Sequence, residues 1–219
     1  MTGGVSPGRS SVLRRRIRWI VTATIAYNVV EAIVALAAGS AASSAALIGF
    51  GLDSTIEVLS AGAVAWQFTR RDPERWEKGT LRVIAVAFFA LAISVTAGSA
   101  MALLGRVEVA HAPVGIALTA LSVIVMPFLS FAERRAGREL GSATAVADST
   151  QTLICAYLSA AVLVGLVLNS VLGWWWADAI AGLVIAGFAI REGIEAWRGD
   201  ACATSVGMLL EEDGVHRDR

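Results

Sequence analysis

The feature that most constrains this chain is a series of six apolar segments, each about 20 residues long or longer. They lie at residues 17–38, 44–68, 80–104, 112–132, 144–170 and 174–196. A helix of about 20 apolar residues crosses roughly 30 Å of hydrocarbon. Hydrophobic residues also make up 56% of the sequence, against roughly 45–50% in a soluble domain. The pattern predicts an all-α membrane protein with six transmembrane helices.

The basic residues predict the orientation of these spans, because Lys and Arg in short loops stay on the cytoplasmic side. With the exception of Arg106, they fall at the two termini or around the connections after the second and fourth spans. We expect these connections at residues 70–80, where Pro73 is a helix breaker, and at residues 131–142. Both termini are therefore expected to be cytoplasmic. We divide the chain into a basic N-terminus at 1–16, a six-helix transmembrane domain at 17–198 and a short cytoplasmic tail at 199–219.

Four acidic residues in the first, second and fifth predicted spans are the strongest pointer to function. They are Glu31, Asp53, Glu57 and Asp148. A charged side chain at the centre of a spanning helix costs roughly 2.5–3.5 kcal/mol on insertion scales, so it rarely occurs without a partner or a function. The spans contain no Lys, Arg or His at a comparable depth. The compensating positive charge is therefore expected to come from outside the protein, as a cation.

The spacing of these residues predicts two polar helix faces. Asp53 and Glu57 are four residues apart and so share one face of the second span. Asp148, Gln151 and Thr152 share one face of the fifth span in the same way. If the two faces meet, they form a cage of carboxylate, amide and hydroxyl oxygens that would bind a divalent cation.

Simpler interpretations of the same residues stay open. Asp53 and Glu57 could be protonated and hydrogen-bonded to neighbouring helices, and Asp148 could be an acid favoured at the start of a helix. Glu31 with Asn28, and likewise Gln151 with Thr152, could be interhelical hydrogen-bonding groups.

Other polar residues are expected to have no role in this site. Cys155 and Cys202 have no metal-type spacing and are predicted to be small buried or incidental residues. His111 and His216 are predicted to be solvated. Asp178 is predicted to lie at the start of the sixth helix, at the outer interface.

Three stretches of the chain resemble the cation diffusion facilitator (cation efflux) family. They are VVEAIVALAAGSAASSAALIGFGLDSTIE, ERRAGRELGSATAVADSTQT and GWWWADAIAGLVIAGFAIREGIEAW. The resemblance implies a cation-efflux transmembrane bundle, with Asp53, Glu57 and Asp148 as three of four transport-site ligands. The fourth position falls on Thr152, where the family usually has Asp, and Gln151 could supply a carbonyl oxygen instead.

The resemblance also implies the function. We expect a multi-pass protein of a bacterial inner membrane that exports a divalent cation by proton antiport, without enzymatic activity, resident cofactor or nucleic-acid partner. Zinc is the first candidate for the exported ion because the resemblance to the family implies it. An all-oxygen cage would instead suit harder ions such as Mn²⁺ or Mg²⁺, with Fe²⁺ and Co²⁺ between them. The tail is too short for the cytoplasmic domain that most members carry, so a homodimer is expected to form through contacts between spans.

Two other functions fit parts of the pattern. A non-transporting membrane module could bind the cation for sensing or assembly. An intramembrane aspartyl protease also uses two aspartates on two spans, and GFGLD superficially resembles its glycine motif, but the glycines are out of register with Asp53.

Overall fold

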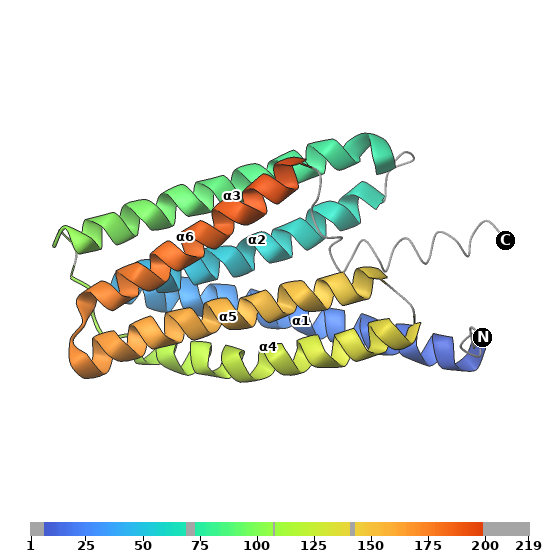
Figure 1. Cartoon of the computed structure of the whole chain (residues 1–219), viewed down its shortest axis with the longest axis horizontal. Helices are drawn as coiled ribbons and strands as arrows, with labels where there is room; N and C mark the ends of the chain where they lie inside the picture. The colour runs from blue at the N-terminus through green and yellow to red at the C-terminus, as the bar shows by residue number, and fades with distance from the viewer. Residues whose placement is uncertain (1–6, 69–72, 107, 141–142, 199–219) are drawn as a thin grey trace.

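The computed structural model of the chain is a bundle of six long helices, which confirms the predicted fold class (Figure 1). Each helix corresponds to one of the six apolar segments. The helices are α1 (Pro7–Ala42), α2 (Ala45–Phe68), α3 (Pro73–Leu103), α4 (Pro113–Leu140), α5 (Ala143–Leu172) and α6 (Trp175–Arg198).

The structure describes residues 7–68, 73–106, 108–140 and 143–198. Within these ranges, the side chains of residues 7–11, 14, 62–68, 73–77, 143–145, 147 and 148 are not described. The predicted tail at 199–219, with Cys202 and His216, lies outside the described residues. The side chain of Asp148 lies outside them too.

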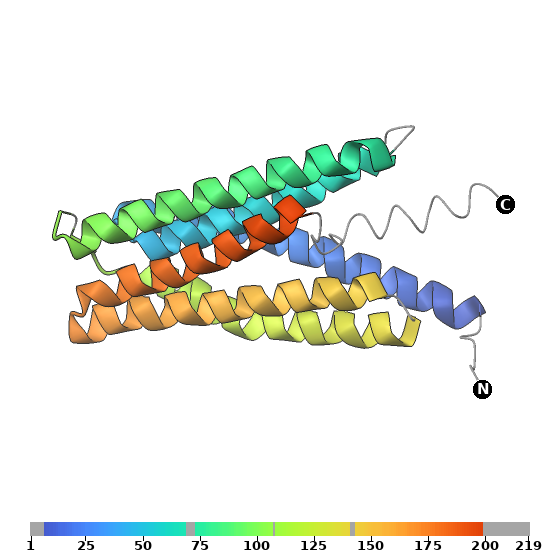
Figure 2. The ribbon, with the colours of Figure 1, turned by 45° about the horizontal axis from the view of Figure 1, so that its top comes forward.

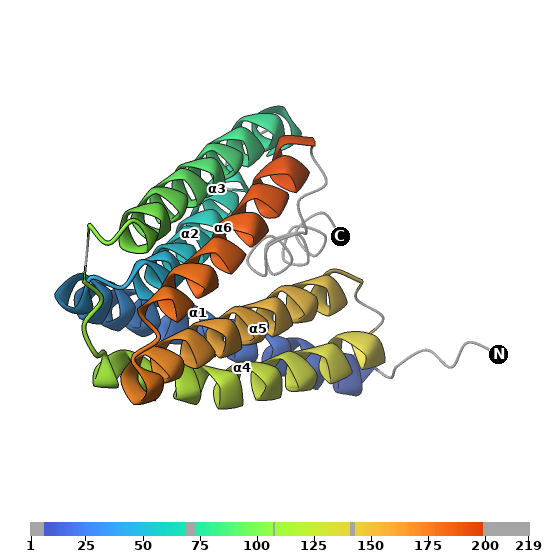
Figure 3. The ribbon, with the colours of Figure 1, turned by 60° about the vertical axis from the view of Figure 1, so that its left-hand side comes forward.

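The helices form a closed ring in which each contacts two neighbours, in the order α1, α2, α3, α6, α5, α4 and back to α1. Helix α2 also contacts α5 and α6, so it is the element that joins the two halves of the ring. The chain runs up and down, and the start of α1 lies at the same end of the bundle as the end of α6 (Figure 1). The ribbons of α2, α3 and α6 diverge from those of α1, α4 and α5 toward that end (Figure 2 and Figure 3).

Four of the helices contain stretches that are long and apolar enough to cross a membrane. Within the described residues, these stretches are Arg15–Ala42, Lys78–Leu103, Pro113–Leu140 and Ser149–Leu172. Helices α2 and α6 are not among them, because the side chains of α2 are described only as far as residue 61 and α6 carries charged residues near both ends. Both are nevertheless 24 residues long, or about 36 Å, which exceeds the thickness of the hydrocarbon core.

Two connections are shorter than the sequence predicts. The segment 70–80 was expected to be a loop broken by Pro73, but α3 begins at Pro73. Proline suits the first helical position, where its missing N–H has no partner to lose and its φ angle is already helical. The segment 131–142 was likewise expected to be a connection, but α4 continues to Leu140.

Glycines bring α2 unusually close to α1. A Cβ atom added to Gly51 would lie 2.9 Å from the backbone nitrogen of Leu36, and one added to Gly39 would lie 2.8 Å from that of Ile48. Because backbone atoms cannot move aside easily, larger residues at these positions would push the two helices apart. This close packing holds α2 in register with α1, so that Asp53 and Glu57 lie at the level of Asn28 and Glu31.

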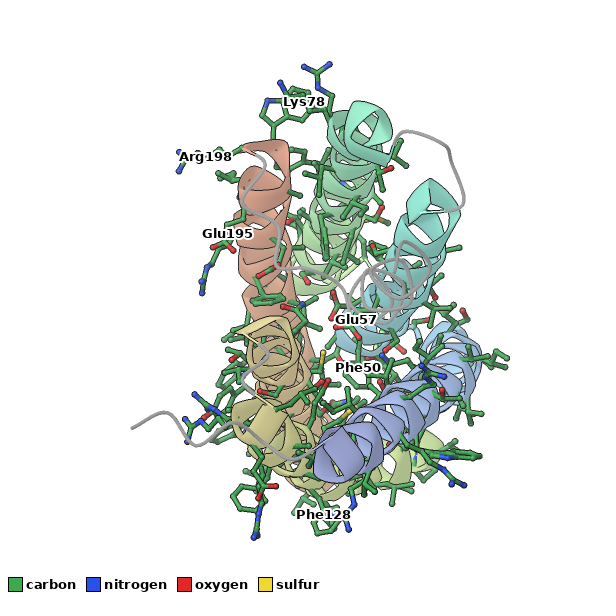
Figure 4. All side chains as sticks on the ribbon, turned by 90° about the vertical axis from the view of Figure 1, so that its right-hand side faces the viewer. Phe50, Glu57, Lys78, Phe128, Glu195 and Arg198 are labelled. Atoms are coloured by element: carbon green, nitrogen blue, oxygen red, sulfur yellow. The ribbon has the colours of Figure 1, made fainter. Side chains whose placement is uncertain are left out.

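An apolar cluster fills the bundle on the side of the α1–α2, α3–α4 and α5–α6 connections. Its largest members are Leu47, Phe50, Leu166 and Ile185, all almost fully buried. The view along the bundle shows Phe50 and Glu57 inside the ring of helices, whereas Phe128 points outward from α4 (Figure 4). Because Phe50 precedes Asp53 by three residues on α2, Asp53 lies one turn from this apolar cluster.

Candidate metal site

Three potential metal ligands from two helices meet in the middle of the bundle. Asp53 and Glu57 of α2 and Cys155 of α5 each offer one ligand atom, and these atoms all lie within 4.8 Å of one another. Asp53 is 3% exposed and Cys155 is 5% exposed, while Glu57 is partly buried. The end view shows Glu57 pointing into the space enclosed by the helices (Figure 4). The face of α2 that carries Asp53 and Glu57 thus meets α5 at Cys155.

Hydrogen bonds from two other helices orient the Glu57 carboxylate. The Sγ–H group of Cys155 donates to Oε1 at 2.6 Å, and Nδ2 of Asn28 donates to Oε2 at 2.7 Å. Asn28 belongs to α1 and is 6% exposed. Its other amide atom, Oδ1, has no hydrogen-bond partner among the described residues. A buried amide oxygen without a described hydrogen-bond partner therefore belongs to the residue that holds Glu57.

The surroundings of Asp53 are acidic. Glu31 of α1 and Glu192 of α6 both interact electrostatically with its carboxylate, and the Glu57 carboxylate lies in the same cluster. Like charges in a medium of low dielectric constant repel one another strongly. The fold concentrates negative charge at this point, and binding a cation would relieve the repulsion.

Glu31 lies in a separate hydrogen-bonded cluster beside this group. It is almost fully buried, and it accepts a hydrogen bond from the Ser54 hydroxyl of α2 at 2.9 Å and another from the Ser122 hydroxyl of α4. The Tyr27 hydroxyl lies 2.7 Å from Ser122 Oγ. Glu31 thus links three helices, in agreement with the interpretation that it is an interhelical hydrogen-bonding group.

The other predicted ligands are on α5. Thr152 is buried and Gln151 is half-buried, one turn before Cys155 on the same helix. Asp148 lies in the first turns of α5, and its side chain is not described. Asp53 and Glu57 lie together in the structure, while the assignment of all five predicted residues as metal ligands stays a prediction.

Three members of the site are not predicted from the sequence. Cys155 follows Asp148 by seven residues and Thr152 by three, which places all three on one helix face, so this spacing could have identified it. Asn28 precedes Glu31 by one turn, but nothing in the sequence pairs it with Glu57. Glu192 lies close to the end of the last span, and only the packing of α6 on α2 brings it near Asp53.

Another buried acid, Asp178, lies against the N-terminal end of α2. Asp178 is in the first turn of α6, as predicted, but it is 0% exposed and does not lie at an interface with solvent. Its Oδ1 atom accepts a hydrogen bond from the Ser44 hydroxyl at 2.5 Å. The backbone N–H groups of Ala45 and Ala46 lie near the carboxylate and favour its charged form, while Oδ2 has no hydrogen-bond partner among the described residues. These N–H groups form the N-terminus of α2, where the helix dipole favours negative charge.

The glycines of GFGLD have packing roles that need no catalytic explanation. Gly51 allows the close approach to α1, and a Cβ atom added to Gly49 would lie 2.7 Å from a methyl group of Val95 on α3. The resemblance of this motif to that of intramembrane proteases is therefore accounted for by helix packing.

The fold and the site together define a multi-pass helical membrane protein with a buried acidic group at its centre. A comparison with known families agrees with this class and makes it more specific. The sequence matches the cation efflux transmembrane domain over residues 21–198. The chain therefore belongs to the cation efflux family, and the resemblance noted from the sequence is confirmed.

A curated relative covers part of the chain. The cation-efflux pump FieF of Shewanella oneidensis is 33% identical over 84 residues, which amount to 38% of this chain and 28% of the relative. The aligned region thus spans less than a third of that protein. The bacterial source of this relative agrees with the expected location in a bacterial inner membrane.

Proposed function

We propose that this protein exports a divalent transition-metal ion from the cytoplasm, with zinc first and manganese, iron or cobalt as the other candidates. The ion binds between α2 and α5 and leaves in exchange for protons. The observation that carries the proposal is the buried group of Asp53, Glu57 and Cys155, whose ligand atoms lie within 4.8 Å of one another. Family membership supports transport rather than catalysis.

Charge and chemistry support a divalent cation as the substrate. The site offers carboxylate oxygens and a sulfur atom, and the nearby charged groups of Asp53 are acidic. Carboxylates are ligands for many divalent ions, whereas a buried carboxylate without a positive partner is strongly unfavourable. A doubly charged ion satisfies both requirements at once.

Exchange with protons follows from competition for the same atoms. A carboxylate must be deprotonated to bind a metal, so a proton arriving from the outer side would weaken the site and promote release. Proton antiport also reduces the net charge moved, which matters because each elementary charge costs about 2.3 kcal/mol per 100 mV of opposing potential. We place this exchange in a homodimer whose subunits contact through their membrane spans.

The test is counterflow in reconstituted vesicles with a pH gradient, using a panel of Zn²⁺, Co²⁺, Fe²⁺, Mn²⁺ and Mg²⁺. Wild-type protein is expected to carry at least one transition-metal ion, and Asp53→Ala is expected to carry none. Glu108→Gln, which changes an exposed acid in the α3–α4 connection, is the matched control and should retain wild-type flux.

Unimpaired flux in Asp53→Ala would overturn the proposal. Saturable metal binding by the wild-type protein with no flux of any ion would favour the alternative of a membrane cation sensor, which binds the ion and does not move it. Collapse of the pH gradient should reduce flux if protons are exchanged, and flux that is independent of the gradient would remove proton antiport from the mechanism.

A further inference from the structure

The sulfur atom of Cys155 distinguishes this site from a cage built only of oxygen atoms. From the sequence we expected oxygen ligands alone, and such a set would favour hard ions. In the structure, Cys155 Sγ belongs to the same cluster as the two carboxylates of α2. The class of cation that the site selects therefore depends on whether the sulfur binds the metal.

We infer that Cys155 is a metal ligand and that it selects cations that accept sulfur, such as Zn²⁺, Co²⁺ and Cd²⁺, over cations that prefer oxygen alone, such as Mg²⁺ and Mn²⁺. The inference rests on the proposed function in one respect, namely that the ion bound here is the ion transported. Ligation itself can be measured without any transport.

The distances within the cluster are compatible with one shared ion. Ligand atoms lie about 2.0–2.3 Å from Zn²⁺, so two of them are about 3.3–3.8 Å apart in a tetrahedral site. The atoms of Asp53, Glu57 and Cys155 lie within 4.8 Å of one another. Side-chain rotations that move these atoms together by up to about 1 Å would bring all three into contact with one ion.

A second residue, Asn28, indicates that the site is built for a ligand. An unpartnered buried amide oxygen costs about 1–3 kcal/mol, and Asn28 Oδ1 is in this state among the described residues. Its Nδ2 atom holds Glu57 Oε2 at 2.7 Å, so the amide group lies at the edge of the cluster. The amide that holds Glu57 thus carries a buried oxygen acceptor that has no partner among the described residues.

The competing explanation is that Cys155 is a core residue whose thiol only donates a hydrogen bond to Glu57. A small apolar residue would fill the same volume without facing two acids, and a thiol is a weak hydrogen-bond donor. When a metal binds, the S–H bond breaks, the proton goes to solvent and the sulfur electron pair forms the bond to the ion. No oxidation or reduction is involved.

The test is the absorption spectrum of purified full-length protein titrated with Co²⁺, because Co²⁺ bound to a thiolate gives a sulfur-to-metal charge-transfer band in the near ultraviolet. The wild type and Cys202→Ser, the control for the other cysteine, should both show the band. Cys155→Ser and Cys155→Ala should lack it. Cys155→Ser should also lower the affinity for Cd²⁺ relative to Mn²⁺ by about tenfold or more.

Absence of the band in the wild type, or its survival in a folded Cys155→Ser protein, would overturn the inference. Two variants at position 155 guard against loss of folding, which is checked by thermal melting in detergent. Failure of the inference and failure of the proposed function are distinguishable. A charge-transfer band without flux would refute transport and support Cys155 as a metal ligand. Flux without a band would support transport and refute Cys155 as a metal ligand.

Discussion

Two buried acids on or against α2 show how differently a membrane protein can hold a carboxylate. Asp178 packs against the start of α2, accepts a hydrogen bond from Ser44 and lies near two backbone N–H groups that favour its charged form. Asp53 lies two turns into α2, where the backbone N–H groups are already used within the helix. Its charged neighbours include Glu57, Glu31 and Glu192, which are also acids.

The difference shows which buried carboxylate needs a positive charge that the protein does not supply. The N-terminus of α2 supplies unpaired N–H groups and a partial positive charge, so the negative charge of Asp178 is compensated by the fold itself. The middle of a helix offers no such compensation. Asp53 therefore requires an added cation or a proton, which is the property expected of a transport ligand and not of a structural residue.

The most informative test of this difference between Asp53 and Asp178 is a substitution that removes the charge of Asp53 and keeps its shape. Asp53→Asn should lower metal affinity by about 100-fold or more, because a charged ligand is lost. It should leave the unfolding temperature in detergent unchanged or raise it, since an uncompensated buried charge disappears. Calorimetric metal titration and thermal melting of the same preparation measure both effects. Wild-type affinity in this variant would remove Asp53 from the site.

Acidity should weaken metal binding through Asp53 and Glu57 and should have no effect on binding through Asp178. Because Asp53 and Glu57 must be deprotonated to bind the ion, affinity should fall as pH falls, by about tenfold per pH unit for each proton displaced. The pH dependence should be shallower in Asp53→Asn and unchanged in Asp178→Asn. Affinity measured from pH 8 down to pH 5.5 provides the test, and a pH-independent affinity would argue against carboxylate ligands.

Adding a carboxylate ligand on α5 should strengthen metal binding. Thr152→Asp puts a carboxylate where the family usually has one, and we expect about tenfold tighter Zn²⁺ binding, because a neutral hydroxyl is replaced by a charged ligand. Thr150→Asp, at an exposed position of the same helix, is the matched control. Equal affinities in the two variants would mean that Thr152 does not face the ion.

Neutralising Asp178 should have the smallest effect on binding and a distinct effect on stability. Asp178→Asn loses a charge-assisted interaction with the N-terminus of α2, which should reduce the free energy of unfolding by about 1–3 kcal/mol. Metal affinity of the folded protein should stay within about threefold of wild type, because Asp178 is not part of the cluster. A loss of affinity comparable to that of Asp53→Asn would contradict the assignment of Asp178 as structural.

Interactions within one helix could be predicted from the sequence, whereas those between helices could not. The six helices follow from the apolar segments, and the shared face of Asp53 and Glu57 follows from their spacing of four. The contacts of Glu57 with Asn28 and Cys155 depend on how α1 and α5 pack against α2. That packing is set by close glycine contacts such as that of Gly51, whose partner residues cannot be read from a single sequence.

The boundaries of α3 and α4 illustrate a second limit. Charged segments at the ends of spans were expected to be loops, but the helices continue beyond the apolar region, because Glu, Lys and Arg are good helix formers. Hydropathy marks where a helix lies in lipid and does not mark where it ends.

The central claim is that α2 and α5 converge on a single cation, and anomalous diffraction from zinc-loaded crystals of the wild-type protein tests it most directly. We expect one strong anomalous peak inside the bundle, within bonding distance of Asp53, Glu57 and Cys155. Zinc found only at acidic groups on the surface, with no peak between these two helices at saturating concentration, would contradict the account.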